Sequence, residues 1–112
     1  MRYKDVVVDA GSTAMFVRVR HWTTLEGDWN RFVSRLEHEG VEAMTAIDGF
    51  LRLVVSGDPM SNSVVTVTFW KSEAAERVYE INKAHAFGEV VKDFVAGPPS
   101  TFAYPVVYDR EA

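Results

Sequence analysis

The sequence predicts a single α+β domain in which helices cover one face of an antiparallel sheet. Four segments have the β-branched and aromatic composition or the apolar–polar alternation of strands. Two longer segments repeat apolar residues at spacings of three and four, as amphipathic helices do. The order along the chain is strand, helix, strand, strand, helix, strand. This is the split βαβ order of the ferredoxin-like fold, with four antiparallel strands and both helices on one face.

The first strand and the first helix follow residues 1–13, which we interpret as an N-terminal arm preceding a domain of residues 14–112. Residues 14–22 alternate with the period of two that is typical of a strand. Asp28 is a residue type that caps helices, and apolar residues from Trp29 to Met44 follow at helical spacing. We expect this helix to fray near Gly40.

A hairpin is predicted next. The Asp48–Gly49 turn leads into a strand over residues 50–55, and residues 57–62 are dense in turn formers that cannot continue it. The partner strand spans residues 63–71 and ends in Trp70, at a corner with the second helix. A large aromatic residue at that corner suggests a pocket between the sheet and its covering helix.

The second helix is predicted to begin after Ser72, whose hydroxyl can accept a hydrogen bond from a free N–H of the first turn. The helical pattern continues to residue 95, with Gly88 expected to bend or loosen it. Residues 101–108 are predicted to form the last strand, in which Pro105 indicates an edge position or a bulge because proline has no N–H to donate. The apolar stripe of the helix comprises Ala75, Val78, Ile81, Phe87, Val91 and Phe94.

A sheet covered on one face leaves its second face open. We expect that face to carry large apolar residues, namely Phe16, Trp22, Phe50, Val64, Trp70 and either Phe102 or Tyr104. Because exposed apolar patches of that size usually mark interaction surfaces, the sequence predicts a homodimer formed through the sheets.

Composition excludes several classes of function. The net charge is −4, with 12 Lys and Arg against 16 Asp and Glu, which argues against non-specific nucleic-acid binding. The chain has no cysteine, so disulfides, thiolate catalysis and thiolate metal sites are excluded. No apolar run approaches the roughly 18 residues of a membrane span, and the first residues lack the apolar core of a secretory signal. We therefore expect a cytoplasmic protein without a membrane partner.

The Phe69–Ala74 corner, the Asp48–Leu51 turn and a histidine in the second helix, His85, together resemble the antibiotic biosynthesis monooxygenase family. The resemblance covers residues 16–108 and implies a dimeric α+β barrel. It is more specific for the fold than for the chemistry. The family includes cofactor-free oxygenases of electron-rich phenols or quinols, haem-degrading enzymes and proteins without an assigned reaction.

The haem-degrading branch of the family relies on three residues that this chain lacks. At the positions of its first-strand Asn, its helix Trp and its haem-ligating His, the chain has Arg20, Tyr79 and a residue at or near Glu89. The resemblance therefore implies no haem. The sequence also contains no glycine-rich phosphate loop and no nucleophile elbow, so we expect no cofactor.

His85 is the first candidate for a catalytic residue. A neutral imidazole can take a proton from a phenol near pH 7, because its unperturbed pKa is about 6.5. The alternative is an ordinary surface histidine beside Lys83 and Glu89. His85 and Glu89 share a helix face, but a metal site would also need His21 to reach them, and a plain surface contact is the favoured interpretation.

Two arginines supply the second candidate. Arg18 and Arg20 lie on the same strand face as Trp22, and two cations there require solvent, carboxylates or an anionic ligand. They form salt bridges at a dimer interface, line a solvated rim, or stabilise a phenolate or enolate. For substrate binding we select Arg18 and the aromatic residues Trp70, Tyr79 and Phe87, for which a core role is the alternative.

The resemblance implies a cofactor-independent monooxygenase that acts on an electron-rich aromatic or quinol and on molecular oxygen. In that scheme His85 is the base, and Arg20 or Arg18 stabilises the anion. Two other classes stay open: a non-redox cyclase or isomerase that uses the same base, and a non-catalytic dimer that binds a small ligand. Consumption of oxygen separates the first class from the other two.

Overall fold

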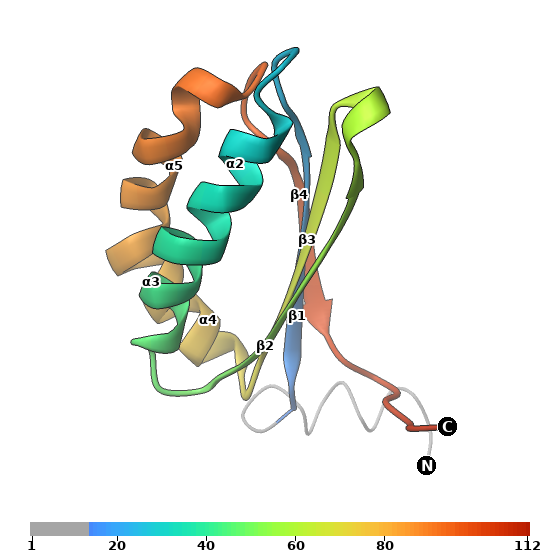
Figure 1. Ribbon diagram of the computed structural model, residues 1–112. Helices are drawn as coiled ribbons and strands as arrows, with labels where there is room; N and C mark the ends of the chain where they lie inside the picture. The colour runs from blue at the N-terminus through green and yellow to red at the C-terminus, as the bar shows by residue number, and fades with distance from the viewer. Residues whose placement is uncertain (1–13) are drawn as a thin grey trace.

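The computed structural model describes residues 14–112, so the predicted N-terminal arm lies outside the described residues. The strands are β1 (Phe16–Thr23), β2 (Phe50–Asp58), β3 (Ser63–Trp70) and β4 (Ser100–Pro105). They form a four-stranded antiparallel sheet in the order β2-β3-β1-β4, and the helices pack on one side of it (Figure 1). The predicted α+β architecture is confirmed.

Both predicted helices form, and each contains a π-helical turn. The first passes through α2 (Trp29–Arg35), η1 (Leu36–Gly40) and α3 (Val41–Thr45), of which η1 is π-helical. The second passes through α4 (Glu73–Tyr79), the π-helical η3 (Glu80–Ala84), α5 (His85–Val91) and the 3₁₀ turn η4 (Lys92–Phe94). Another 3₁₀ turn, η2 (Pro59–Ser61), joins β2 to β3. No helix within residues 14–112 has the length and apolarity needed to cross a membrane.

Local signals account for some helix ends and not for others. Ser72 caps α4 as predicted, since its hydroxyl accepts a hydrogen bond from the backbone N–H of Ala75 at 3.2 Å. Asp28 precedes α2 without capping it, and its carboxylate instead accepts a hydrogen bond from Arg31. The turn before β3 begins only at Pro59, so β2 extends beyond the predicted residues 50–55.

The irregularity expected at Gly88 is displaced, whereas near Gly40 the helix has a π-helical turn in place of fraying. Gly88 lies inside the regular helix α5, and the second helix departs from α-helical hydrogen bonding at residues 80–84 instead. Gly40 is buried rather than frayed. A Cβ added there would lie 2.9 Å from Leu36 Cδ1 and 3.2 Å from Phe87 Cε1, so the glycine permits close packing of the two helices.

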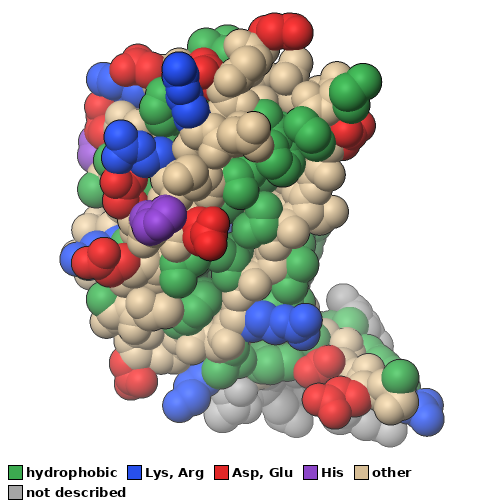
Figure 2. Space-filling model, viewed as in Figure 1, with side chains coloured by type: hydrophobic (Ala, Val, Ile, Leu, Met, Phe, Trp, Pro, Cys, Tyr) green, Lys and Arg blue, Asp and Glu red, His purple; other side chains and the backbone are tan. Residues whose placement is uncertain are grey.

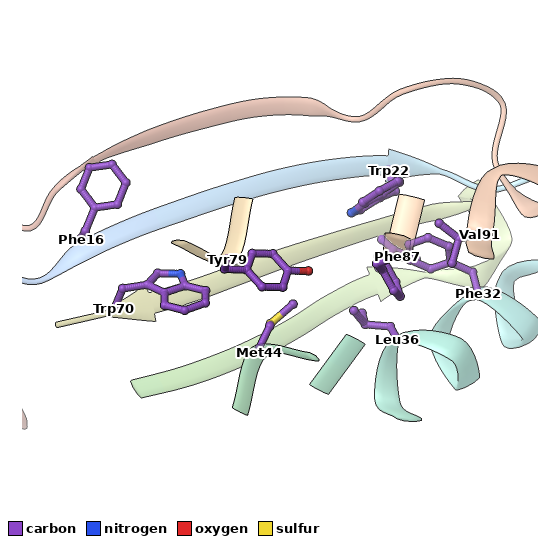
Figure 3. Close-up of a cluster of buried hydrophobic side chains, with 10 residues drawn as sticks. Phe16, Trp22, Phe32, Leu36, Met44, Trp70, Tyr79, Phe87 and Val91 are labelled. Atoms are coloured by element: carbon purple, nitrogen blue, oxygen red, sulfur yellow. The ribbon is translucent and has the colours of Figure 1, made fainter. Parts of the chain in front are cut away.

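The core lies between the sheet and the helices (Figure 3). Trp70 is fully buried, with its ring centroid 5.3 Å from that of Phe50 and 5.5 Å from that of Tyr79. The predicted stripe of the second helix is partly wrong, because Val78 and Ile81 are 44% and 73% exposed. The buried side of that helix consists of Glu76, Tyr79, Phe87 and Val91.

The open face of the sheet also differs from the expected one. Most of the large residues assigned to it, Phe16, Trp22, Val64 and Trp70, are buried on the helix side, and Phe50 packs against Trp70 there. Because residues opposite one another in the strands share a face, the open face carries instead Val17, Val19, Val54, Val65, Val67, Phe69, Phe102 and Tyr104. Figure 2 shows charged side chains gathered over the helices and fewer of them toward the sheet.

The open face is still apolar enough to predict a homodimer. Phe102 and Tyr104 are 55% and 63% exposed, and their ring centroids are 6.2 Å apart. Light scattering should give twice the chain mass of 12.6 kDa. Phe102→Glu should lower the measured mass to that of one chain, whereas Ile81→Glu on the exposed helix surface should leave the dimer intact. A monomer in the unsubstituted protein contradicts the prediction.

Gly49 is predicted to be required at the turn into β2. Its φ is +100°, and a Cβ there would lie 2.7 Å from Cβ of Ala75. Gly49→Ala should therefore lower the free energy of unfolding by about 2 kcal/mol or more. Gly88→Ala is the matched control, because nothing lies within 4 Å of the added Cβ and the site is helical. It should raise that free energy by about 0.5–1 kcal/mol, and equal effects in urea denaturation would contradict the prediction.

Candidate functional site

A cavity of about 20 Å³, the inner cavity, lies between the sheet and the two helices. Its volume corresponds to about one water molecule. Strands β1 and β3 form one wall, and both helices form the other. The lining residues are Arg18, Arg20, Trp22, Leu36, Met44, Thr66, Thr68, Tyr79 and Phe87.

Two ion pairs connect β1 to the second helix beside this cavity. Arg18 donates two hydrogen bonds to Glu76, from Nε to Oε2 at 2.6 Å and from Nη2 to Oε1 at 2.8 Å. Nη2 of Arg20 donates to Oε1 of Glu80, and Nε of Arg18 lies 3.8 Å from Oε2 of Glu80. The two glutamates are four residues apart and therefore share one face of the helix. The two arginines are two residues apart on the strand and therefore share one face of the sheet, so each arginine meets one glutamate.

Burial controls the charge of this cluster. The side chain of Glu76 is 3% exposed, and that of Glu80 is 24% exposed. Burial raises the pKa of Glu76, and contact with Glu80 adds to this although Arg18 opposes it. Burial also opposes ionisation of Glu80, but contact with Glu76 and the hydrogen bond from Arg20 outweigh it and lower its pKa. Burial and ion pairing thus shift the pKa values of the two carboxyl groups in opposite directions.

The polar groups that face the inner cavity are mainly hydrogen-bond donors. Arg18 and Arg20 contribute guanidinium N–H groups, and Trp22 contributes an indole N–H. Burial raises the pKa of Tyr79 to about 12, so its hydroxyl keeps its proton at neutral pH. The residues of the described chain that line the cavity include no carboxylate, since the glutamates lie behind the arginines.

The structure brings together four of the six residues selected from the sequence. Arg18, Arg20, Tyr79 and Phe87 all line the inner cavity. Trp70 does not line it: its ring packs behind Tyr79, and its Nε1 donates to Oγ1 of Thr68 at 3.0 Å. Trp70 thus occupies the core position that was the alternative interpretation.

His85 lies apart from the arginines. Its side chain is 88% exposed, and its Nε2 is 3.9 Å from Oε1 of Glu89. It lines a separate surface hollow of about 300 Å³ together with Trp22 and the Pro98–Pro99 segment. His21, which a metal site with His85 and Glu89 would need, lies on the open face of the sheet. Residues 14–112 contain no cluster of His, Asp or Glu arranged for a metal.

Glu76 and Glu80 are the site residues that the sequence reasoning missed. A usable signal existed, because carboxylates four apart flank Tyr79 on a helix predicted to cover the sheet, and the first strand carries two arginines on one face. The predicted apolar face of the second helix, which included Val78 and Ile81, concealed this pattern because it directs the two glutamates toward solvent.

Comparison with known proteins gives the fold a context. No protein-family model and no curated protein sequence matches the chain. Among solved structures, a monooxygenase from the ActVA-Orf6 gene of Streptomyces coelicolor, in complex with nanaomycin D, is 21% identical. The match covers 88% of this chain and 90% of that one, with a TM-score of 0.70.

Two further structures agree. SnoaB, a cofactor-independent oxygenase from Streptomyces nogalater, is 15% identical, with 88% of this chain and 96% of SnoaB covered at a TM-score of 0.70. A protein from Caulobacter crescentus assigned to the antibiotic biosynthesis monooxygenases is 13% identical, with 89% and 96% covered at a TM-score of 0.75. The fold is that of the antibiotic biosynthesis monooxygenases. The resemblance noted in the sequence is thereby confirmed at the level of the fold.

The Arg18–Glu76 pair is predicted to be required for stability. Arg18→Met leaves the Glu76 carboxylate buried without its cation. The substitution should lower the free energy of unfolding by about 3 kcal/mol at pH 7. This value is at the lower end of the range for a buried ion pair, because the side chain of Arg18 is 20% exposed. The double variant Arg18→Met/Glu76→Leu should recover most of that loss.

The same substitution should show a pH dependence of defined sign. Without Arg18 the folded-state pKa of Glu76 rises further, so the folded state of the variant loses stability as the pH increases above the unfolded value of about 4.3. The difference between Arg18→Met and the unsubstituted protein should thus be smaller at pH 4 than at pH 7 in urea denaturation. A difference independent of pH contradicts this account.

Proposed function

We propose that this protein is a cofactor-independent monooxygenase that acts on an electron-rich aromatic, such as a phenol or quinol, with molecular oxygen. The observation that carries the proposal is the lining of the inner cavity, where two cations and neutral donors face the space and their carboxylates lie behind. Such a lining favours an anionic oxygen over a neutral one. The fold shared with SnoaB and the ActVA-Orf6 monooxygenase supports this class of reaction.

The chemistry begins with loss of a proton from the substrate hydroxyl. The resulting anion is stabilised by Arg20 and Arg18, which are held in place before the reaction and act in a largely water-free site. The released proton passes to the solvent, because no carboxylate lines the cavity and the glutamates lie behind the arginines. The substrate is then the sole reductant: one oxygen atom enters the product, and the other leaves as water.

The substrate ring needs more room than the inner cavity provides. Phe87 also lines a hollow of about 330 Å³ between the two helices, the outer hollow, whose other apolar residues are Ala43, Ala46, Ala86 and Val90. Small ligands usually occupy 300 Å³ or more. Because Phe87 lines both spaces, the proposal requires its ring to move, so that the substrate ring occupies the outer hollow and the substrate oxygen the inner cavity.

The prediction from the sequence that His85 acts as the base is separate from this scheme and is tested on its own below. His85 is separated from the arginines, although Trp22 lines both its hollow and the inner cavity. The cyclase or isomerase and the non-catalytic ligand-binding dimer are the alternatives. Either could use the same donor-lined cavity without consuming oxygen.

Arg20 is predicted to be required for turnover. With 1,8-dihydroxyanthrone as a probe substrate, Arg20→Gln should lower the rate of oxygen uptake about 10²–10³-fold, the usual effect of losing one group that stabilises developing negative charge. Arg31→Gln is the control, because that side chain is 71% exposed on α2. Equal rates for the two variants contradict the proposed site.

His85→Ala distinguishes the two catalytic arrangements in the same assay. If the donor-lined cavity drives ionisation, the variant keeps its rate and its pH profile. A fall of about 10²–10⁴-fold, with loss of the limb near the pKa of histidine, would assign the base to His85 instead. Absence of oxygen uptake by the unsubstituted protein, with binding of the probe retained, would favour the non-oxygenase alternatives.

A further inference from the structure

Within residues 14–112, one buried donor at the inner cavity lacks a hydrogen-bond partner, and a second donor lies on the same cavity. Nε1 of Trp22 has no acceptor within residues 14–112, although Trp22 is only 8% exposed. The hydroxyl of Tyr79, a residue that is 2% exposed, forms no hydrogen bond with any other described residue. Buried N–H groups are nearly always paired, so the unpaired indole N–H beside this cavity requires an explanation.

The other tryptophans show what is usual in this chain. Nε1 of Trp29 donates to the carbonyl oxygen of Ser63 at 2.8 Å, and Nε1 of Trp70 donates to Oγ1 of Thr68 at 3.0 Å. Of the three indoles, the one beside the cavity is thus the one without an acceptor. The unpaired state is a property of this site rather than of tryptophans in the fold.

The two donors are directed at the same space. Figure 3 shows the indole nitrogen of Trp22 on the side of its ring toward Tyr79, and the Tyr79 hydroxyl directed toward Trp22. Trp22 comes from β1 and Tyr79 from α4, and both line the inner cavity. We propose that the Trp22 indole N–H and the Tyr79 hydroxyl form a donor pair that binds a carbonyl oxygen of the ligand.

The ligand class follows from the number of donors, their charge and the room available. A carbonyl oxygen has two lone pairs and accepts two hydrogen bonds, one from each donor. Both donors are neutral, so they suit a neutral oxygen, whereas the arginines of the same cavity suit an anionic one. A volume of about 20 Å³ is too small for a ring, so only oxygen substituents of the ligand enter the cavity and the ring lies outside it.

The fitting ligand is a flat ring that carries an ionisable hydroxyl group close to a ring carbonyl, as a hydroxyquinone does. The inference deepens the proposed function and rests on it for the reaction, while the binding itself can be tested without turnover. Trp22 and Tyr79 thereby become ligand-positioning residues.

The test uses the indole N–H signals of the full chain labelled with ¹⁵N-tryptophan and assigned by Trp→Phe variants. On titration with 2-hydroxy-1,4-naphthoquinone, the Trp22 signal should move far more than the signals of Trp29 and Trp70. With 2-naphthol, which has a hydroxyl group but no ring carbonyl, the Trp22 signal should move little.

Affinities test the second donor. Tyr79→Phe should weaken binding of the quinone about five- to tenfold, the usual effect of one hydrogen bond, and leave binding of 2-naphthol unchanged. Tyr108→Phe, which alters a tyrosine 69% exposed outside the sheet, should change neither affinity. Because Tyr79→Phe removes one oxygen atom only, it keeps the test decisive even if Trp22→Phe fails to fold.

Three results would overturn the inference: no binding of the quinone at millimolar concentration, binding with a stationary Trp22 signal, or equal losses of quinone and naphthol affinity in Tyr79→Phe. If the Trp22 indole N–H is bound to a water molecule that the quinone does not displace, the inference also fails. If the Trp22 signal moves but no oxygen is consumed with any probe, the donor pair stands and the oxygenase proposal fails.

Discussion

The ion pairs between β1 and the second helix are the constraint on which the rest of the structure depends. Two arginines on the helix-facing side of a sheet are tolerable only if carboxylates meet them there. The second helix therefore turns Glu76 and Glu80 inward. Its more hydrophobic residues Val78 and Ile81 remain at the surface as a consequence.

Aromatic residues enclose this polar centre at both ends. Toward the start of β1, Trp70 packs against Phe50 and Tyr79; toward its end, Trp22 and Phe87 meet edge to face with centroids 6.3 Å apart. These rings limit the access of water, and in such surroundings the charges and donors of the cavity act more strongly than they would in water. The hydrophobic core and the candidate site are thus parts of one arrangement.

The π-helical turn η3 brings Tyr79 and Phe87 to the same side of the second helix. Tyr79 and Phe87 are eight positions apart, a spacing that turns side chains about 80° from each other in a regular α-helix. The wider turn over residues 80–84 reduces that angle, and both side chains line the inner cavity. Short π-helical segments of this kind are frequent at functional sites. No residue pattern in the sequence marks this one.

The sequence by itself determined the order of the strands and helices, the Ser72 cap, the edge position of Pro105 and the shared face of Arg18, Arg20 and Trp22. Each of these depends on neighbours a few residues away, whose effects periodicity and residue type express directly. Periodicity groups residues on one face of an element but does not say which way the face turns. Only the tertiary structure decided that the arginine face packs under the helices, because their partners lie 58 and 60 positions away and the choice depends on the packing of the whole chain.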